Sequence, residues 1–123
     1  MTAIIDATFE RVGGGELQTM SVEVRDHLPF GVVGLDAGGI TRVYNETEAR
    51  MAGLNPEKVL GISFFDAVAQ CMNNFMVAQR FEDEPELDAI VPFVLTLRMR
   101  PTRVRLRLLA SKSRPLRFIL IDR

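Results

Sequence analysis

The chain has 123 residues, 47% of them hydrophobic and 25% charged, which suits one globular domain with a single core. Its net charge of −1 gives no general attraction to nucleic acid or an anionic membrane, and no apolar run is long enough to span a bilayer. A single cysteine excludes an intramolecular disulfide, and with only one histidine a closed zinc site is not expected. The N-terminus lacks the basic and apolar regions of a signal peptide, so we expect a cytoplasmic protein.

The first 27 residues are predicted to form an N-terminal cap. The glycines at 13–15 are typical of a flexible hinge within it. Residues 16–28 favour a helix because Leu17, Met20, Val24 and Leu28 recur at helical spacing, although the valines in this segment also allow a strand.

A β-hairpin is predicted next, with strands at 30–36 and 40–45 around the turn "DAGG". Asn45 ends the second strand and can cap a helix over residues 46–53. Residues 55–61, "NPEKVLG", repeat that pattern, with asparagine as cap, proline in the first turn and glycine at the end.

Residues 63–71 favour a further short helix or turn, and residues 72–87 a longer helix with Phe75 and Phe81 on one side. In the final third of the chain the apolar residues no longer follow helical spacing, and over residues 103–108 they alternate with arginine, as in a half-buried strand. Three strands are predicted there, at 89–101, 102–111 and 115–123. The element order gives an α+β domain: a five-stranded antiparallel sheet with helices on one face.

A row of arginines marks two of these strands. Alternation places them on one surface of the sheet, where they could dock an acidic partner or nucleic acid. No aromatic side chains are interleaved to stack on bases, so a solvated outer face is the favoured interpretation. The row comprises Arg98, Arg100, Arg103, Arg105 and Arg107.

No enzymatic site is indicated. His27, the only histidine, has no nucleophile or supporting motif beside it in the sequence. The glycine-rich stretches match neither a Walker nor a Rossmann phosphate loop. We therefore do not expect an enzyme.

Three singular residues lie close together in the chain: the only tyrosine, Tyr44, then Glu48, then the only cysteine, Cys71. Residues four apart can share a helical face, so Tyr44 and Glu48 could meet. The simpler interpretation is that Glu48 points outward as the capping-box partner of Asn45 and that Cys71 is a small buried apolar residue. From the spacing alone, the simpler interpretation is favoured.

Five motifs lie along residues 28–123: "LDAGGI", "YN" followed by glutamate, "GLNPEKVLGISFF", "DAVAQC" and "MRPTRVRL". With these motifs the segment resembles a PAS domain, and more specifically the photoactive yellow protein family. The resemblance implies a PAS fold over residues 28–123, with residues 1–27 as the N-terminal cap. It also implies a blue-light photoreceptor that signals through photoisomerisation and proton transfer.

The same resemblance assigns the site. It places p-coumaric acid (4-hydroxycinnamic acid) as a thioester on Cys71, with Tyr44 and Glu48 hydrogen-bonded to its phenolate. Three further residues fall at pocket positions: Phe64, Val68 and Met99.

The chain departs from the family pattern around this pocket. Alanine and leucine stand where a supporting threonine and a lid arginine are usual, leucine replaces a pocket tyrosine, and glutamine replaces the proline before the cysteine. These positions are Ala52, Leu54, Leu97 and Gln70. The alternative is a PAS module without chromophore, used for protein–protein interaction or dimerisation. For either function we expect a downstream signalling protein as partner, a possible homodimer, and neither nucleic acid nor membrane.

Overall fold

Five strands form one antiparallel sheet in the order β2-β1-β5-β4-β3. The structure is a computed structural model that describes residues 7–96 and 100–123. Its strands are β1 (Gly31–Leu35), β2 (Thr41–Tyr44), β3 (Leu87–Leu95), β4 (Thr102–Ala110) and β5 (Arg117–Asp122). Its helices are α1 (Gly14–Thr19), α2 (Val22–Asp26), α3 (Glu46–Ala52), α4 (Pro56–Val59) and α5 (Ala78–Asp83), with a π-helical turn η1 (Phe64–Val68) and a 3₁₀ turn η2 (Gln70–Met72).

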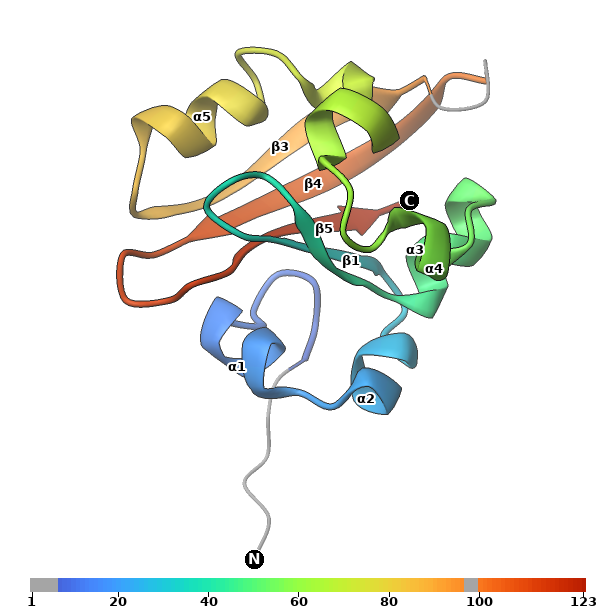
Figure 1. Ribbon diagram of the computed structural model, residues 1–123, viewed down its shortest axis with the longest axis horizontal. Coiled ribbons are helices and arrows are strands. Elements are labelled where there is room, and N and C mark those ends of the chain that lie inside the picture. The colour runs from blue at the N-terminus through green and yellow to red at the C-terminus, as the bar shows by residue number, and fades with distance from the viewer. Residues whose placement is uncertain (1–6, 97–99) are drawn as a thin grey trace, which may run out of the picture.

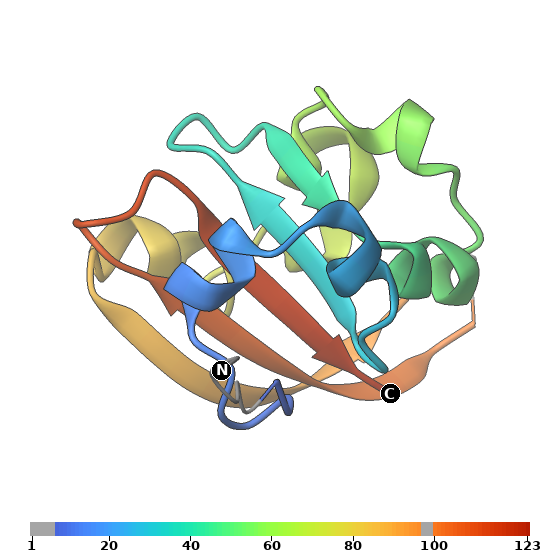
Figure 2. The ribbon, with the colours of Figure 1, turned by 90° about the horizontal axis from the view of Figure 1, so that it is seen from below.

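The sheet separates two helical layers. Figure 1 shows α5 on one side of the sheet and α1 and α2 on the other, and Figure 2 shows α1 and α2 lying across the strands. Side chains along the central strands alternate between the two faces of the sheet, so each of these strands contributes residues to the core on both sides. Ile119 and Ile121 of β5 belong to the core on the α5 side, whereas Phe118 and Leu120 belong to the core under α1. The predicted α+β class, five-stranded antiparallel sheet and short helices are confirmed.

Side-chain caps fix the helices that follow the hairpin. The Asn45 Oδ1 accepts hydrogen bonds from the backbone amides of Glu48 and Val32, so one buried side chain starts α3 and ties it to β1. Asn55 caps α4 in the same way, through the amide of Glu57. Both caps agree with the sequence prediction.

The helix predicted over residues 16–28 is wrong as a single element. The chain is extended at Met20 and Ser21, and the Ser21 hydroxyl accepts a hydrogen bond from the Val24 amide to begin a second helix. A side chain that caps a new helix competes with continuation of the old one. Val24 is therefore 49% exposed rather than part of a buried stripe.

The long helix predicted over residues 72–87 is also wrong, because only α5 forms. The Asn74 Oδ1 accepts from the amides of Met76 and Val77, and this local turn replaces the first helical turns. Phe75, predicted on the buried side, is 78% exposed as a result. Phe81 is buried, as expected, with the Arg117 guanidinium 5.3 Å from its ring centroid.

The triple glycine does not form the expected hinge. Gly13 precedes α1, and Gly14 and Gly15 make its first turn. The Arg114 guanidinium lies so close to Gly14 that a Cβ there would come within 2.6 Å of Nη2. The glycine thus permits a close contact between the N-terminal cap and the turn before β5.

Two arginines of the row, Arg105 and Arg107, hold the cap onto the sheet. Arg107 is 5% exposed: it pairs with Asp88 at 2.9 Å and donates to the backbone oxygens of Phe9 and Val12 at 3.0 and 2.6 Å. Arg105 binds Glu10 and Asp122 and lies 4.8 Å from the centroid of the Phe9 ring.

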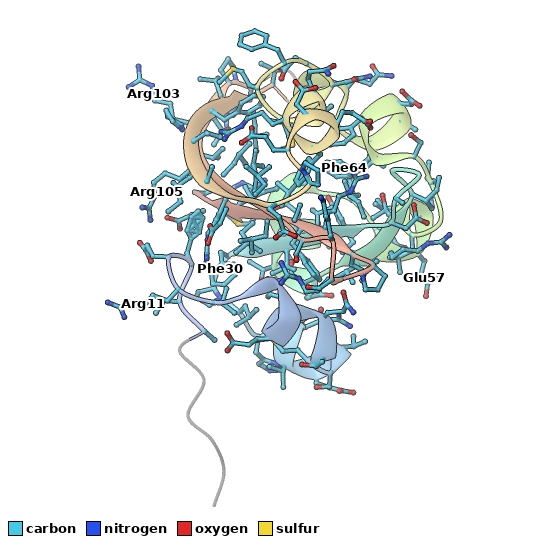
Figure 3. The ribbon with its side chains drawn as sticks, turned by 90° about the vertical axis from the view of Figure 1, so that its left-hand side faces the viewer. Arg11, Phe30, Glu57, Phe64, Arg103 and Arg105 are labelled. Carbon is cyan, nitrogen blue, oxygen red and sulfur yellow. The ribbon has the colours of Figure 1, made fainter. Side chains whose placement is uncertain are left out.

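Figure 3 shows Arg105 beside the N-terminal segment, and Phe30 and Phe64 on opposite sides of the sheet. The favoured interpretation, a solvated outer face, is wrong for Arg107, because the cap covers it. Arg103 is exposed, and Arg98 lies outside the described residues.

Acid is expected to loosen the cap. The Arg107 guanidinium holds the pKa of Asp88 below its ordinary value of 3.8, so this pair stabilises the fold above that pH and its contribution is lost as pH falls further. Asp88 is 60% exposed, so the contribution is small. Pepsin cleavage within residues 7–20, measured relative to cleavage elsewhere in the chain, should increase modestly below pH 3.8. Equal cleavage of that segment at both pH values would contradict this expectation.

Candidate functional site

Tyr44 lies at the end of β2 with its side chain in the core on the α5 side. It is 6% exposed, and burial raises the pKa of its phenol well above the ordinary value of 10.0, as does the nearby charge of Glu48. The phenol therefore keeps its proton throughout the range in which the protein would work. A buried tyrosine in this state is a hydrogen-bond donor.

Glu48 occupies the first turn of α3 and points inward. It is 1% exposed, and its carboxylate accepts two hydrogen bonds from Arg123, at 2.6 and 3.0 Å. Burial raises the pKa of Glu48, and the paired guanidinium acts in the opposite direction. The simpler interpretation is thus wrong: Asn45 does cap α3, but the Glu48 carboxylate bonds Arg123 instead of returning to the cap.

Gly31 makes room for that carboxylate. A Cβ built on Gly31 would overlap the Oε1 of Glu48, so only glycine lets α3 pack this closely on the start of β1. Because position 31 has no side chain, the Glu48 carboxylate has room to lie in the interior beside the start of β1.

Cys71 lies in η2 and is a free, partly exposed thiol. The prediction of a buried apolar cysteine is therefore only partly met. The thiol borders an open groove of about 630 Å³ between the segment around η2 and the β3–β4 strand pair. The groove is lined by Cys71, Asn74, Met76, Pro92, Phe93, Val94, Thr96, Arg103 and Val104.

The structure brings most of the predicted site residues to one core. Tyr44 and Phe64 are members of the buried cluster on the α5 side, and Val68 and Cys71 pack against it. The groove beside Cys71, however, is not lined by Tyr44 or Glu48. Met99, the remaining predicted pocket residue, lies outside the described residues, as does Leu97.

Two of the positions that depart from the family pattern lie on the surface. Leu54 is 38% exposed and Gln70 is exposed, whereas Ala52 is buried in α3 at 3% exposure. None of the three can supply a charge to the interior.

Sequence reasoning missed Arg123, which completes the site. Its partner is 75 positions away in the chain, so no local motif links the two residues. One signal was available: alternation along β5 puts residue 123 on the same face as Ile119 and Ile121. An arginine on an apolar face calls for a buried acidic partner, and Glu48 is that partner.

Comparison with solved structures defines the class. The PAS domain of an HTR-like protein from Haloarcula marismortui aligns over 89% of this chain and 97% of its own, with a TM-score of 0.61 and 21% identity. At that identity the likeness shows the fold, and the fold is that of a PAS domain. No protein-family model matches the chain.

The chain belongs to the photoactive yellow protein family. The photoactive yellow protein of Halochromatium salexigens is 33% identical over 92 residues, 72% of this chain and 74% of the relative. That of Rhodothalassium salexigens is 32% identical over 83 residues, 65% and 66% of the two chains.

A solved structure agrees with this assignment. The photoactive yellow protein domain of the sensor histidine kinase Ppr from Rhodospirillum centenum aligns over 89% of this chain and 98% of its own, with a TM-score of 0.82 and 34% identity. The predicted resemblance is thereby confirmed. Among the described residues, no helix has the length and apolar character needed to cross a bilayer.

Proposed function

We propose that this protein is a blue-light receptor that carries p-coumaric acid as a thioester on Cys71. The observation that carries the proposal is that the only thiol packs against the same core that contains the only phenol, Tyr44. The buried, titratable Glu48 influences that phenol electrostatically. Membership of the photoactive yellow protein family supports the same assignment.

The residue types suit this group. A partly exposed thiol can attack an activated p-coumaroyl thioester, so that a new carbon–sulfur bond forms at Cys71 and the donor thiol leaves. Once bound, the group would supply an absorbing double bond that isomerises in blue light. Tyr44, protonated and buried, can donate a hydrogen bond to a phenolate oxygen, and Glu48 can hold or release a proton at its carboxylate.

The assigned roles need some rearrangement of the core. The groove at Cys71 is not lined by Tyr44 or Glu48, so side chains of the buried cluster must move for one group to contact all three residues. The groove volume of about 630 Å³ lies within the usual range of small-molecule pockets, roughly 300–1,000 Å³. Met99 remains a proposed pocket residue.

A second candidate is a PAS module without chromophore. One observation favours it: the Glu48 carboxylate is already satisfied by Arg123 and needs no ligand. Such a module would act in the cytoplasm by binding a signalling protein or a second copy of itself.

Absorption and intact mass after mixing with activated p-coumaroyl thioester separate the two candidates. A visible band and a single adduct are expected, and Cys71→Ala should remain colourless while folding normally. A coloured Cys71→Ala protein would exclude Cys71 as the attachment site. Wild-type protein that takes up no adduct would leave the module without chromophore as the function.

Replacing Glu48 with glutamine is expected to shift the absorption of the anionic pigment to longer wavelength. An amide donates a weaker hydrogen bond than a carboxylic acid, so less negative charge stays on the phenol oxygen and more spreads along the conjugated chain. The measurement is the spectrum of both reconstituted proteins during a pH titration. Glu46→Gln, an exposed change on the same helix, is the control and should leave the band in place. Coincident bands for wild type and Glu48→Gln would show that Glu48 does not contact the phenolate.

A further inference from the structure

The ion pair between Glu48 and Arg123 is unusual in its burial. The two guanidinium nitrogens Nη1 and Nη2 each donate to one carboxylate oxygen, at 2.6 and 3.0 Å. The side chains are 2% exposed for Glu48 and 15% exposed for Arg123. Two parallel, charge-assisted hydrogen bonds shielded from water make a strong and geometrically specific contact.

The groups that face this carboxylate come from different elements. Arg123 follows β5, Tyr44 ends β2, and the Cα of Gly31 at the start of β1 contributes no side chain. Tyr44 interacts electrostatically with both Glu48 and Arg123. Of these groups only Arg123 carries a permanent charge, because a guanidinium does not lose its proton in proteins.

The proposed photoreceptor function requires Glu48 to change charge. Without chromophore the Glu48 carboxylate is paired with Arg123. A phenolate beside it would disfavour a second negative charge and keep Glu48 protonated in the dark. Transfer of that proton to the phenolate in the light breaks the carboxyl O–H bond and forms a phenol O–H bond, so one negative charge moves from the phenolate to Glu48. A carboxylate left unpaired in this interior would be strongly disfavoured. Arg123 already contacts both oxygens on which that charge would reside.

We infer that Arg123 is the counterion that receives the Glu48 carboxylate after proton transfer and so stabilises the light-activated state. Arg123 is thus a positioning residue that acts through Glu48. The inference rests on the proposed photoreceptor function and adds to it a residue that sets how long the activated state lasts. It also implies that the negative charge on Glu48 is neutralised inside the core, by Arg123.

The first test uses protein without chromophore. The side-chain carboxyl of Glu48, labelled with ¹³C, is titrated by NMR in wild type, Arg123→Leu and Arg123→Lys. Arg123→Leu should raise the midpoint by at least about one pH unit, a tenfold change in proton affinity. Arg123→Lys should raise it less, because lysine keeps the charge but loses the paired geometry.

Arg50→Leu, an exposed change on the same helix as Glu48, is the matched control and should leave the midpoint unchanged. If Arg123→Leu does not fold, the Arg123→Lys titration decides the result. Midpoints equal to wild type in the variants that fold would overturn the inference.

The second test uses protein loaded with p-coumaroyl thioester and a light flash. Arg123→Leu should shorten the lifetime of the activated state about tenfold or more, because the less stable carboxylate recovers its proton sooner. An unchanged lifetime beside a shifted midpoint would overturn the counterion role while leaving the ion pair itself established. If no visible band forms in wild type, the proposed function fails, and the role in the light cycle fails with it.

Discussion

Replacing Arg107 with leucine is expected to release the N-terminal cap from the sheet while the rest of the domain stays folded. The guanidinium satisfies the backbone oxygens of Phe9 and Val12, and leucine would leave both without this donor. An unsatisfied buried acceptor costs about 1–3 kcal/mol, so opening of the cap should become at least about tenfold more frequent.

Hydrogen exchange measures this opening directly. The amides of Val12, Leu17 and Met20 donate to backbone oxygens within the cap, and their protection should fall in Arg107→Leu. Arg103→Leu is the control, because Arg103 is exposed on the same strand. Protection of those three amides at the wild-type level would show that Arg107 does not hold the cap in place.

Replacing Gly31 with alanine is expected to destabilise the whole domain. The new methyl group would displace the Glu48 carboxylate and pull it from Arg123. Overpacking costs about 1–3 kcal/mol and disruption of a buried ion pair about 3–5 kcal/mol, so a loss of roughly 3 kcal/mol or more is expected. The free energy of unfolding in urea gives the value.

Two comparisons separate this mechanism from a general effect of added volume. Gly15→Ala should be neutral or slightly stabilising, because Gly15 lies in α1 and a Cβ there would come no closer than 3.8 Å to Arg114. In a Glu48→Ala background, Gly31→Ala should lose most of its effect, since the clashing carboxylate is gone. Equal losses of unfolding free energy in both backgrounds would show that the destabilisation does not come from contact between the new methyl group and Glu48.

Local sequence signals predicted much of the fold. Alternation of arginine with valine and leucine marked β4, and the asparagine caps marked the starts of α3 and α4. These features were visible because each depends on residues a few positions apart. The helix breaks were not foreseen, because Ser21 and Asn74 interrupt the chain through hydrogen bonds that the apolar pattern does not reveal.

The candidate site was predictable only in part. The resemblance to a known family named Tyr44, Glu48 and Cys71, and the structure packs Tyr44 and Cys71 with one core. The partners of the charged groups were hidden, because Glu48 and Arg123 meet only after the sheet has formed. The same holds for Arg107, whose acceptors lie in a segment 95 and 98 positions earlier.

The end of β5 has a consequence for communication within the molecule. Asp122 pairs with Arg105, which also holds Glu10 of the cap, while the next residue, Arg123, holds Glu48. Neighbouring residues in a strand point to opposite faces. One peptide bond therefore joins Asp122, which is linked through Arg105 to the cap, to Arg123, which binds the buried Glu48. A change of charge at Glu48 therefore has a covalent path to the opposite face that is two residues long. A signal can thus cross the sheet at the C-terminal end of its central strand, β5.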